Sequence, residues 1–460
     1  MKANVRRLAY FILAGLAAIC LYLAAIPPYI AHITGTGTGP VDPRVSAREN
    51  IIKRGDILDR NGRVLARSVP AERGYTREYP LGAAAAHIIG YYSSRYGSAG
   101  LEKSQAPVLL GLENDNKLSN LFNRILGQPA TGNNVILTID ADLQQFTAGL
   151  LRGKKGAAVA INPATGEVLA MASYPDYDPN RVTDYLNRAG SPLLNRAAQG
   201  AYPPGSVFKI VTAAGVLAGA PGITEKTINC TGRLAVGGFT LRDYAAHGMV
   251  DFQDAFAKSC NVAFGRYGLA LGPQKLTRVA REFGVGVKPD FPLPVYEGSI
   301  PPAGKMDDPA VASTAIGQGE ILISPLQAAL LACAVANDGV IMKPYLVAGY
   351  YSPEGGGRKY KPEVWLRAMD PAVAGVLKEA MIAVVREGTG RSAALPGVTV
   401  AGKTGSAENP HGEPHAWFVA FAPAEAPRVA VAVLVENAGS GGANAAPIAR
   451  EIIRRALDRL

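Results

Sequence analysis

Cysteine, histidine and tryptophan are scarce in this chain of 460 residues, with 4, 5 and 2 copies. Cys20, Cys230, Cys260 and Cys333 show neither close pairing nor a Cys-x-x-Cys repeat. A disulfide framework needs paired cysteines, and a zinc motif needs closely spaced ligands. We therefore expect no disulfide framework, no metal ion and no other cofactor.

One histidine pair has the i, i+4 spacing of a helical zinc site, His411 and His415. Pro410, Gly412 and Pro414 surround it, and this composition is incompatible with a helix. The pair therefore does not change the expectation that the chain holds no metal.

The chain also lacks a long run of like charge. Its formal net charge is +10, yet Lys and Arg are spread along the whole sequence. This spread disfavours nucleic acid as a partner and favours an anionic neighbourhood such as lipid head groups or an acidic wall polymer. The hydrophobic content of 48% and the length are those of a globular protein with two or three domains.

Charge is absent from residues 8–26, which as a helix of roughly 19 residues would rise about 28 Å. Lys2, Arg6 and Arg7 precede this segment, and no charge follows it until Asp42. This asymmetry predicts a membrane anchor with a cytoplasmic N-terminus and an extracytoplasmic remainder. A cleaved signal peptide is the alternative, but its apolar region is normally shorter, about 7–15 residues.

Composition divides the rest of the chain. A Gly- and Thr-rich stretch follows the apolar segment, and Asn61-Gly62 between apolar pairs predicts a β-hairpin in the block after it. Nothing in that block indicates chemistry. We expect the following organisation: a cytoplasmic tail (1–7), an anchor (8–27), a linker (28–50), a non-catalytic domain that spaces the next one from the membrane (51–140), and a catalytic domain (141–460).

The catalytic domain is predicted to have an α+β fold. Periodicity is mostly helical between about residues 208 and 338, and a final helix is expected over 445–460. Strands are expected on both sides of the helical middle, at 134–140, 156–161, 167–172, 398–401, 417–422 and 429–435. The simplest architecture is an antiparallel sheet with helices on its faces and an inserted helical subdomain.

The helical middle opens with Tyr-Pro-Pro-Gly-Ser-Val-Phe-Lys, which contains Ser206 and Lys209. The prolines and glycine place Ser206 at a helix start, near unpaired backbone N–H groups. Lys209 emerges three residues later on the same face, where a partly desolvated lysine can take the proton of a serine nucleophile. Alone, Ser-x-x-Lys favours a capping serine beside a surface lysine, because the pattern is so short.

A second short motif, Ser259-Cys260-Asn261, follows the expected helix over 252–258. A hydroxyl and a carboxamide two residues apart can face one cleft, where the hydroxyl relays a proton and the amide holds a peptide. The motif carries no meaning by itself.

The third motif is Lys403-Thr404-Gly405-Ser406, which we expect to continue the strand from residue 398. Gly405 would let a substrate backbone pair with the strand edge, and the lysine and hydroxyls suit a carboxylate. Residues 397–404 also satisfy the P-loop pattern. A phosphate loop needs a flexible loop and then a helix, whereas strand formers stand here and Pro and Gly follow, so we reject that interpretation.

Ser-x-x-Lys, Ser-x-Asn and Lys-Thr-Gly in this order form the signature of the penicillin-recognising serine enzymes. The chain resembles class B penicillin-binding proteins over nearly its whole length after the anchor, and most closely the compact type of actinobacteria and other Gram-positive bacteria. The segments that carry the resemblance, besides the three motifs, are 54–62, 100–102, 158–163, 174–175, 317–320, 324–327, 417–423 and 446–448.

The resemblance implies a peptidoglycan D,D-transpeptidase. Ser206 would be the acylated nucleophile and Lys209 the base that activates it. Ser259 would pass the proton to the departing D-alanine, Asn261 would hold the donor peptide's amide, and Lys403 would support this proton network.

The same resemblance implies that Thr404, Gly405 and Ser406 bind the substrate. The two hydroxyls would bind its terminal carboxylate or the β-lactam that mimics it, and Ser406 stands where many relatives have threonine. The oxyanion hole would be the backbone N–H groups of Ser206 and Ser406.

Expected partners are stem peptides ending in D-Ala-D-Ala, β-lactams, the bacterial cell membrane and a membrane glycosyltransferase of the SEDS type, because the outer domain is too short for a glycosyltransferase. A D,D-carboxypeptidase or β-lactamase is the alternative among enzymes. A β-lactam sensor or an idle scaffold is the alternative from another class, and the intact motifs argue against the scaffold.

Overall fold

The computed structural model describes residues 10, 13–17, 22, 52–72, 74–112, 131–220, 222–352, 355–410 and 412–459. The predicted tail (1–7) and linker (28–50) lie outside these residues, and so does most of the predicted anchor (8–27). No helix within the described ranges is long and apolar enough to cross a membrane.

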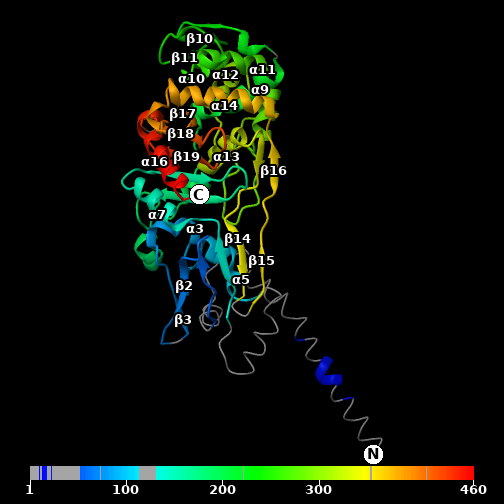
Figure 1. Ribbon diagram of the computed structural model, residues 1–460, viewed down its shortest axis with the longest axis vertical. Coiled ribbons are helices and arrows are strands. Elements are labelled where there is room, and N and C mark those ends of the chain that lie inside the picture. Colours follow the sequence, from blue (N-terminus) through cyan, green and yellow to red (C-terminus); the bar gives the residue numbers. More distant parts are fainter. Residues whose placement is uncertain are drawn as a thin grey trace, which may run out of the picture.

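The predicted antiparallel sheet is present and forms the centre of the molecule (Figure 1). All of its neighbouring strands are antiparallel. In spatial order the strands are β17 (Ala401–Ala407), β18 (His415–Ala422), β19 (Val429–Val435), β7 (Gly156–Ile161) and β8 (Val168–Tyr174). Strands from the two ends of the catalytic segment therefore meet in one sheet, and β17 lies at its edge.

Helices cover both faces of this sheet. In β19, Val431 and Val433 share one core cluster with the residues of α16 (Ala446–Leu457), while Ala432 and Leu434 belong to the other, which contains α13 (Pro325–Ala336). Successive side chains of a strand point to opposite faces of the sheet. Because helices cover both faces at β19, the side chains on both of its faces are apolar and its sequence is a continuous hydrophobic run. The α+β architecture is confirmed.

A helical subdomain lies above the sheet in Figure 1. Its helices are α9 (Lys209–Gly219), α10 (Phe252–Ala257), α11 (Asn261–Glu282) and α12 (Asp308–Ala315). This region also contains two short antiparallel strand pairs that the helical periodicity did not predict. They are β9 (Ile228–Cys230) with β12 (Gly248–Val250), and β10 (Arg233–Val236) with β11 (Phe239–Arg242).

A second sheet of six strands occupies the lower part of Figure 1. Its order is β15 (Gly357–Lys359), β14 (Val347–Tyr351), β6 (Asn134–Leu137), β1 (Ile57–Leu58), β2 (Val64–Pro70) and β3 (Tyr75–Glu78). The predicted hairpin at Asn61-Gly62 joins β1 to β2, with Gly62 at φ +85°. Two strands from the predicted catalytic segment, β14 and β15, complete this N-terminal sheet.

Candidate active site

Ser206 lies in the 3₁₀ turn Gly205–Phe208, which leads directly into α9. The α-helix thus begins at Lys209, three residues later than the sequence predicted, and no side chain caps the turn. Gly205 has φ +54°, and a Cβ there would lie only 2.8 Å from the Ser406 carbonyl oxygen. Glycine is therefore required for the turn to lie against strand β17.

Hydrogen bonds from three other segments fix residues 202–205, which lead to Ser206. The Tyr202 backbone pairs with Ile323, and the Gly205 N–H donates to the Gly317 carbonyl at 2.9 Å. The indole N–H of Trp417, on β18, donates to the Pro203 carbonyl at 3.0 Å. These bonds fix the half-buried Ser206 at the end of the sheet.

Lys209 is fully buried beneath this turn. Its Nζ donates to the Ser259 carbonyl and, at 3.2 Å, to the Ser259 hydroxyl. It also donates to the Asn261 side-chain oxygen at 2.7 Å. Within the described part of the chain, all hydrogen bonds of this amine therefore go to the Ser-x-Asn motif, and none goes to the Ser206 hydroxyl.

Lys403 approaches the same hydroxyl from the sheet. It is fully buried on β17, and its Nζ donates to Ser259 Oγ at 2.9 Å and to the Thr404 carbonyl at 3.1 Å. Ser259 itself has φ +56°, a conformation that costs of order 1–3 kcal/mol for a residue with a side chain. One serine hydroxyl thus bridges two buried lysines.

Burial lowers the pKa of both amines. Loss of solvation lowers the pKa of Lys209 to about 8, although the Asp243 carboxylate acts in the opposite direction. The pKa of Lys403 is lowered well below its usual value, mainly by burial and further by the charge of Lys209. A neutral amine is therefore accessible near neutral pH, and this is what a general base requires.

Strand β17 presents the third motif. The strand begins at Ala401 and not at 398 as predicted, because Val398 only closes a turn with Leu395. Lys403 points into the protein, while the exposed Ser406 is on the other face of the strand and accepts from the Gly441 N–H at 3.4 Å. The last four residues of the P-loop match, 401–404, lie in this strand, and the next element is strand β18 and not a helix, so the nucleotide interpretation stays rejected.

A cleft of about 780 Å³ opens above the two lysines. Six of the predicted site residues line it: Ser206, Ser259, Asn261, Thr404, Gly405 and Ser406. The other two, Lys209 and Lys403, lie directly beneath its wall and contact it through Ser259 and Asn261. The structure brings all eight together.

Sequence reasoning missed other polar residues of this cleft, among them Thr389 and Asp243. The Thr389 hydroxyl lies 2.5 Å from that of Thr404, and Asp243 Oδ2 accepts from the Asn261 N–H at 2.7 Å. Neither lies within ten positions of a motif, so no local spacing indicated them. The metal pair rejected from sequence is only half described: His415 Nδ1 accepts from the Asn437 N–H, and His411 lies outside the described residues.

Two family models match the chain. The model described as penicillin binding protein transpeptidase domain matches residues 156–454, and the model described as penicillin binding protein A dimerisation domain matches residues 54–135.

Relatives match over the full length. The peptidoglycan D,D-transpeptidase PbpA of Mycobacterium tuberculosis is 36% identical over 99% of both chains, and that of Mycolicibacterium smegmatis is 38% identical over 99% of both. Among solved structures, the ceftriaxone acyl-enzyme complex of penicillin-binding protein A from M. tuberculosis matches with a TM-score of 0.85 and 36% identity. It covers 89% of this chain and 100% of that one.

Proposed function

The chain belongs to the class B penicillin-binding proteins and is a peptidoglycan D,D-transpeptidase of cell wall synthesis, and on this premise we propose which of its residues perform each step. The observation that carries the assignment is the convergence of Lys209 and Lys403 on the Ser259 hydroxyl beneath the cleft. We assign the acylation to Ser206, since it lines the cleft in the turn that leads into α9 and lies three residues before the buried Lys209.

The first half-reaction is acyl transfer to Ser206. Its Oγ attacks the carbonyl carbon of the penultimate D-alanine, and the proton of the hydroxyl passes to the neutral amine of Lys209. Burial supports this role because a lysine with a pKa of about 8 is partly neutral at physiological pH. The new Oγ–C bond yields a tetrahedral oxyanion, which the backbone N–H groups of Ser206 and Ser406 stabilise by roughly 3–4 kcal/mol each.

Collapse of that intermediate breaks the peptide bond to the terminal D-alanine. The leaving nitrogen needs a proton, and Ser259 supplies it because its hydroxyl faces the cleft and contacts both lysines. Lys209 then returns the proton to Ser259. Lys403 keeps that hydroxyl oriented by donating to it, which makes it a positioning group in this step.

The donor peptide binds along the free edge of β17. Main-chain pairing with an exposed strand edge is a common mode of peptide recognition, and Gly405 leaves room for it. The hydroxyls of Thr404 and Ser406 bind the terminal carboxylate, and the Asn261 side chain holds the peptide amide. An amine from a second stem peptide then attacks the acyl carbon, releases Ser206 and completes the crosslink.

Labelling with a fluorescent penicillin, followed by peptide mass mapping, tests the nucleophile. We expect one label, on Ser206, and its complete loss in Ser206→Ala. Ser440→Ala, a change in another serine of the same cleft, is the matched control and should keep the label. A label on any other residue, or one that survives Ser206→Ala, contradicts the assignment.

Transfer is separated from hydrolysis by offering a donor stem peptide together with a D-amino acid acceptor. We expect exchange of the terminal residue. Release of D-alanine without exchange would instead identify a D,D-carboxypeptidase, and turnover of the penicillin label would identify a β-lactamase.

We also propose the setting in which this reaction occurs. Residues 8–27 anchor the chain in the bacterial cell membrane with the catalytic domain outside, as the uncharged segment and the basic residues before it support. A SEDS-type glycosyltransferase supplies the glycan strands. Membrane fractionation with and without residues 8–27, and co-purification of the glycosyltransferase from membranes, test these two statements separately.

A further inference from the structure

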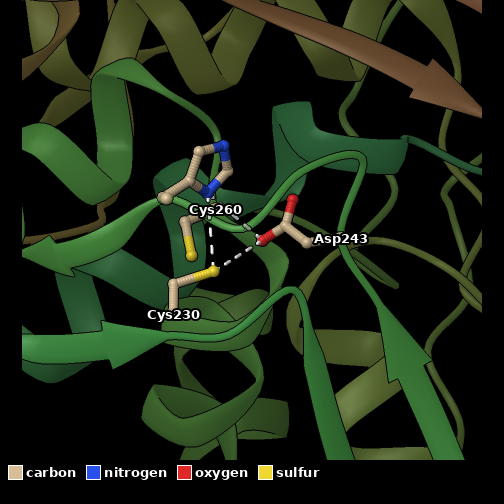
Figure 2. Close-up of side chains that lie close together, drawn as sticks. Cys230, Asp243 and Cys260 are labelled. Atoms are coloured by element: carbon tan, nitrogen blue, oxygen red, sulfur yellow. Dashed lines mark hydrogen bonds and ion pairs between the residues drawn. The ribbon is translucent and has the colours of Figure 1, made fainter.

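Four side chains with metal-binding atoms meet beside the catalytic motif, outside the residues assigned to the reaction. They come from three segments: Cys230 ends β9, Asp243 and His247 lie in the loop between β11 and β12, and Cys260 precedes α11. Their ligand atoms all lie within 4.8 Å of one another. Figure 2 shows the labelled Cys230, Asp243 and Cys260 pointing toward a common centre.

The ligand atoms of this cluster are evenly spaced, and one pair is too far apart for a direct hydrogen bond although the Cys230 thiol is within hydrogen-bonding distance of both neighbours. His247 Nδ1 lies 3.6 Å from Asp243 Oδ2, which is beyond the 2.7–3.2 Å of an N–H···O hydrogen bond. Cys230 Sγ lies 3.6 Å from the same oxygen and 3.6 Å from the same nitrogen. Three different atoms are therefore equally spaced around one point.

This spacing suits a shared tetrahedral ion. Zinc bonds of 2.0–2.3 Å at tetrahedral angles place neighbouring ligand atoms about 3.3–3.8 Å apart. We propose that Cys230, Asp243, His247 and Cys260 form a structural zinc site that holds the Ser259–Asn261 motif in place. The donor set, two thiolates, one imidazole and one carboxylate, is closed and leaves no position for a substrate.

The chemistry of the donors selects the class of metal. Thiolate and imidazole ligands favour zinc and related soft divalent ions, whereas magnesium and calcium require oxygen ligands. The side chains of Asp243 and His247 are 0% and 7% exposed, so the ion would be shielded from solvent. Binding would release the thiol protons and neutralise the buried carboxylate.

Backbone groups already orient two of the ligands. The Asn261 and Val262 N–H groups donate to Asp243 Oδ2 at 2.7 and 3.3 Å, and the Ala263 N–H donates to Cys260 Sγ at 3.4 Å. Metal sites commonly depend on such outer hydrogen bonds. All three N–H groups belong to the first turn of α11, so the site and the start of that helix form one unit.

The position of the site gives it a consequence for catalysis. Cys260 is the central residue of Ser259-Cys260-Asn261, whose flanking residues accept hydrogen bonds from Lys209. An ion bound to Cys260 would tie this motif to β9 and to the loop after β11. The four ligands are positioning residues in this scheme, and that consequence rests on the roles proposed for Ser259 and Asn261.

Metal binding by the purified full chain tests the site directly. After chelation and dialysis, titration with Co²⁺ should give the visible bands of tetrahedral cobalt and thiolate charge-transfer bands, saturating at about one equivalent, and Zn²⁺ should displace them. Cys230→Ser should remove most of the charge-transfer intensity. Cys333→Ser, the matched control at a buried cysteine in α13, should keep the full spectrum.

Several results would overturn the proposal. They are no stoichiometric binding by the unaltered chain, a spectrum that Cys333→Ser changes and Cys230→Ser does not, or a Cys230–Cys260 disulfide found by mass mapping of the protein purified without reductant. The first and third of these do not depend on whether a variant folds.

Penicillin labelling on the same samples tests the catalytic consequence. We expect chelation to slow labelling of Ser206 at least tenfold and Zn²⁺ to restore it, with no such effect of magnesium. Unchanged labelling of the stripped protein would overturn the positioning role. A label that survives Ser206→Ala, together with full cobalt binding, would contradict the assigned nucleophile and leave the metal site intact, so the two proposals fail separately.

Discussion

Two pairs of buried cationic side chains in this molecule differ in whether a carboxylate lies beside them. In the N-terminal part, Arg54 and Arg77 surround the fully buried Glu102, at 3.2 Å and 2.6 Å from its two carboxylate oxygens. In the catalytic part, Lys209 and Lys403 are equally buried, yet neither has a carboxylate within ion-pair distance among the described residues. The two arginines share one counter-charge, whereas the two lysines have none among the described residues.

This difference distinguishes charged side chains that stabilise the fold from amines that can act as a base. A paired arginine remains charged and fixes the segments that it connects, because removing one partner leaves a buried ion. An unpaired buried lysine instead gives up its proton more easily, and this turns it into a base. Polar and hydroxyl acceptors, such as Ser259 and Asn261, orient the lysine without restoring its high pKa.

Replacement of the catalytic base should give the largest effect. Lys209→Met keeps the length of the side chain and removes the amine, so we expect penicillin acylation to slow by about 10²–10⁴-fold. Folding stability should change by less than about 2 kcal/mol, since loss of a poorly solvated amine offsets the acceptors left without a donor. Stopped-flow acylation and urea unfolding measure the two quantities.

The matched control for this change is Lys378→Met on α14 (Pro371–Arg386), where the lysine is partly exposed near Asp338. It should alter neither measurement appreciably. If Lys209→Met acylated at the rate of the unaltered protein, the contrast between the two cation groups would have no chemical meaning.

The catalytic residues were predicted from three short motifs, whose order along the chain and the family resemblance that it supports assigned each residue its role. Ser206 with Lys209, and Ser259 with Asn261, are set by spacing along one turn or one helix start. Thr389 and Asp243 could not be found this way, because their contacts with Thr404 and Asn261 bring together segments distant in sequence.

The same limit applies to the fold. Strands β7, β18 and β19 were predicted within two residues at each end, because long apolar runs indicate buried strands. The pairing of β14 with β6 was not, because it joins segments about two hundred positions apart and no local pattern encodes it. The proximity of Cys230, Asp243, His247 and Cys260 was not predicted either, since these residues lie on three separate segments.

A change in the Arg54–Arg77–Glu102 group should lower stability and leave the acylation rate unchanged, the opposite of the result expected for Lys209→Met. Glu102→Gln keeps the shape of the side chain and leaves two buried guanidinium groups without a counter-charge, so we expect a loss of about 3–5 kcal/mol in the free energy of unfolding. The acylation rate of the molecules that remain folded should be unchanged. Thermal unfolding and acylation on one preparation measure both.

Replacing the Glu102 cluster as a whole sharpens this test. A triple variant with Arg54→Met, Arg77→Met and Glu102→Leu should recover most of the lost stability, because no buried charge remains to be compensated. If the triple variant were no more stable than Glu102→Gln, the loss would have to come from packing and not from charge.

His87 is a buried group whose pKa is lowered although it lies outside the cleft. It is buried in α3 (Ala86–Ile89), and burial lowers its pKa from 6.5 to about 4, with Arg196 acting in the same direction and the bond to the Pro192 carbonyl against it. The unfolded chain therefore binds a proton between these values and the folded chain does not. Stability should fall as pH drops from about 6.5 to about 4, by up to about 3 kcal/mol.

His87→Gln should flatten that dependence in urea unfolding between about pH 7 and pH 4, because a neutral amide has no proton to bind. Its acylation rate should match that of the unaltered protein, since His87 lies outside the cleft. An unchanged pH dependence in the variant would assign the acid sensitivity to other groups.

The pH dependence of acylation should give the smallest effect, expressed per pH unit, and it tests the protonation of Lys209 most directly. Its amine acts only when neutral, and burial places its pKa at about 8. Below that value the acylation rate should rise about tenfold per pH unit, or about 1.4 kcal/mol in activation free energy, and then level off. Burial and the charge of Lys209 lower the pKa of Lys403 as well, whereas the Asp243 carboxylate opposes the shift at Lys209.

Stability provides the independent check on that pKa. Between about 8 and 10.5 the unfolded lysine holds a proton that the folded one has lost, so the stability contributed at Lys209 should increase as pH rises through this window. Lys209→Met should lose this increase, while Lys378→Met should keep it. A rate profile that levels off near pH 8 without the matching stability increase would place the titrating group elsewhere, and the unpaired lysine would then no longer explain the base.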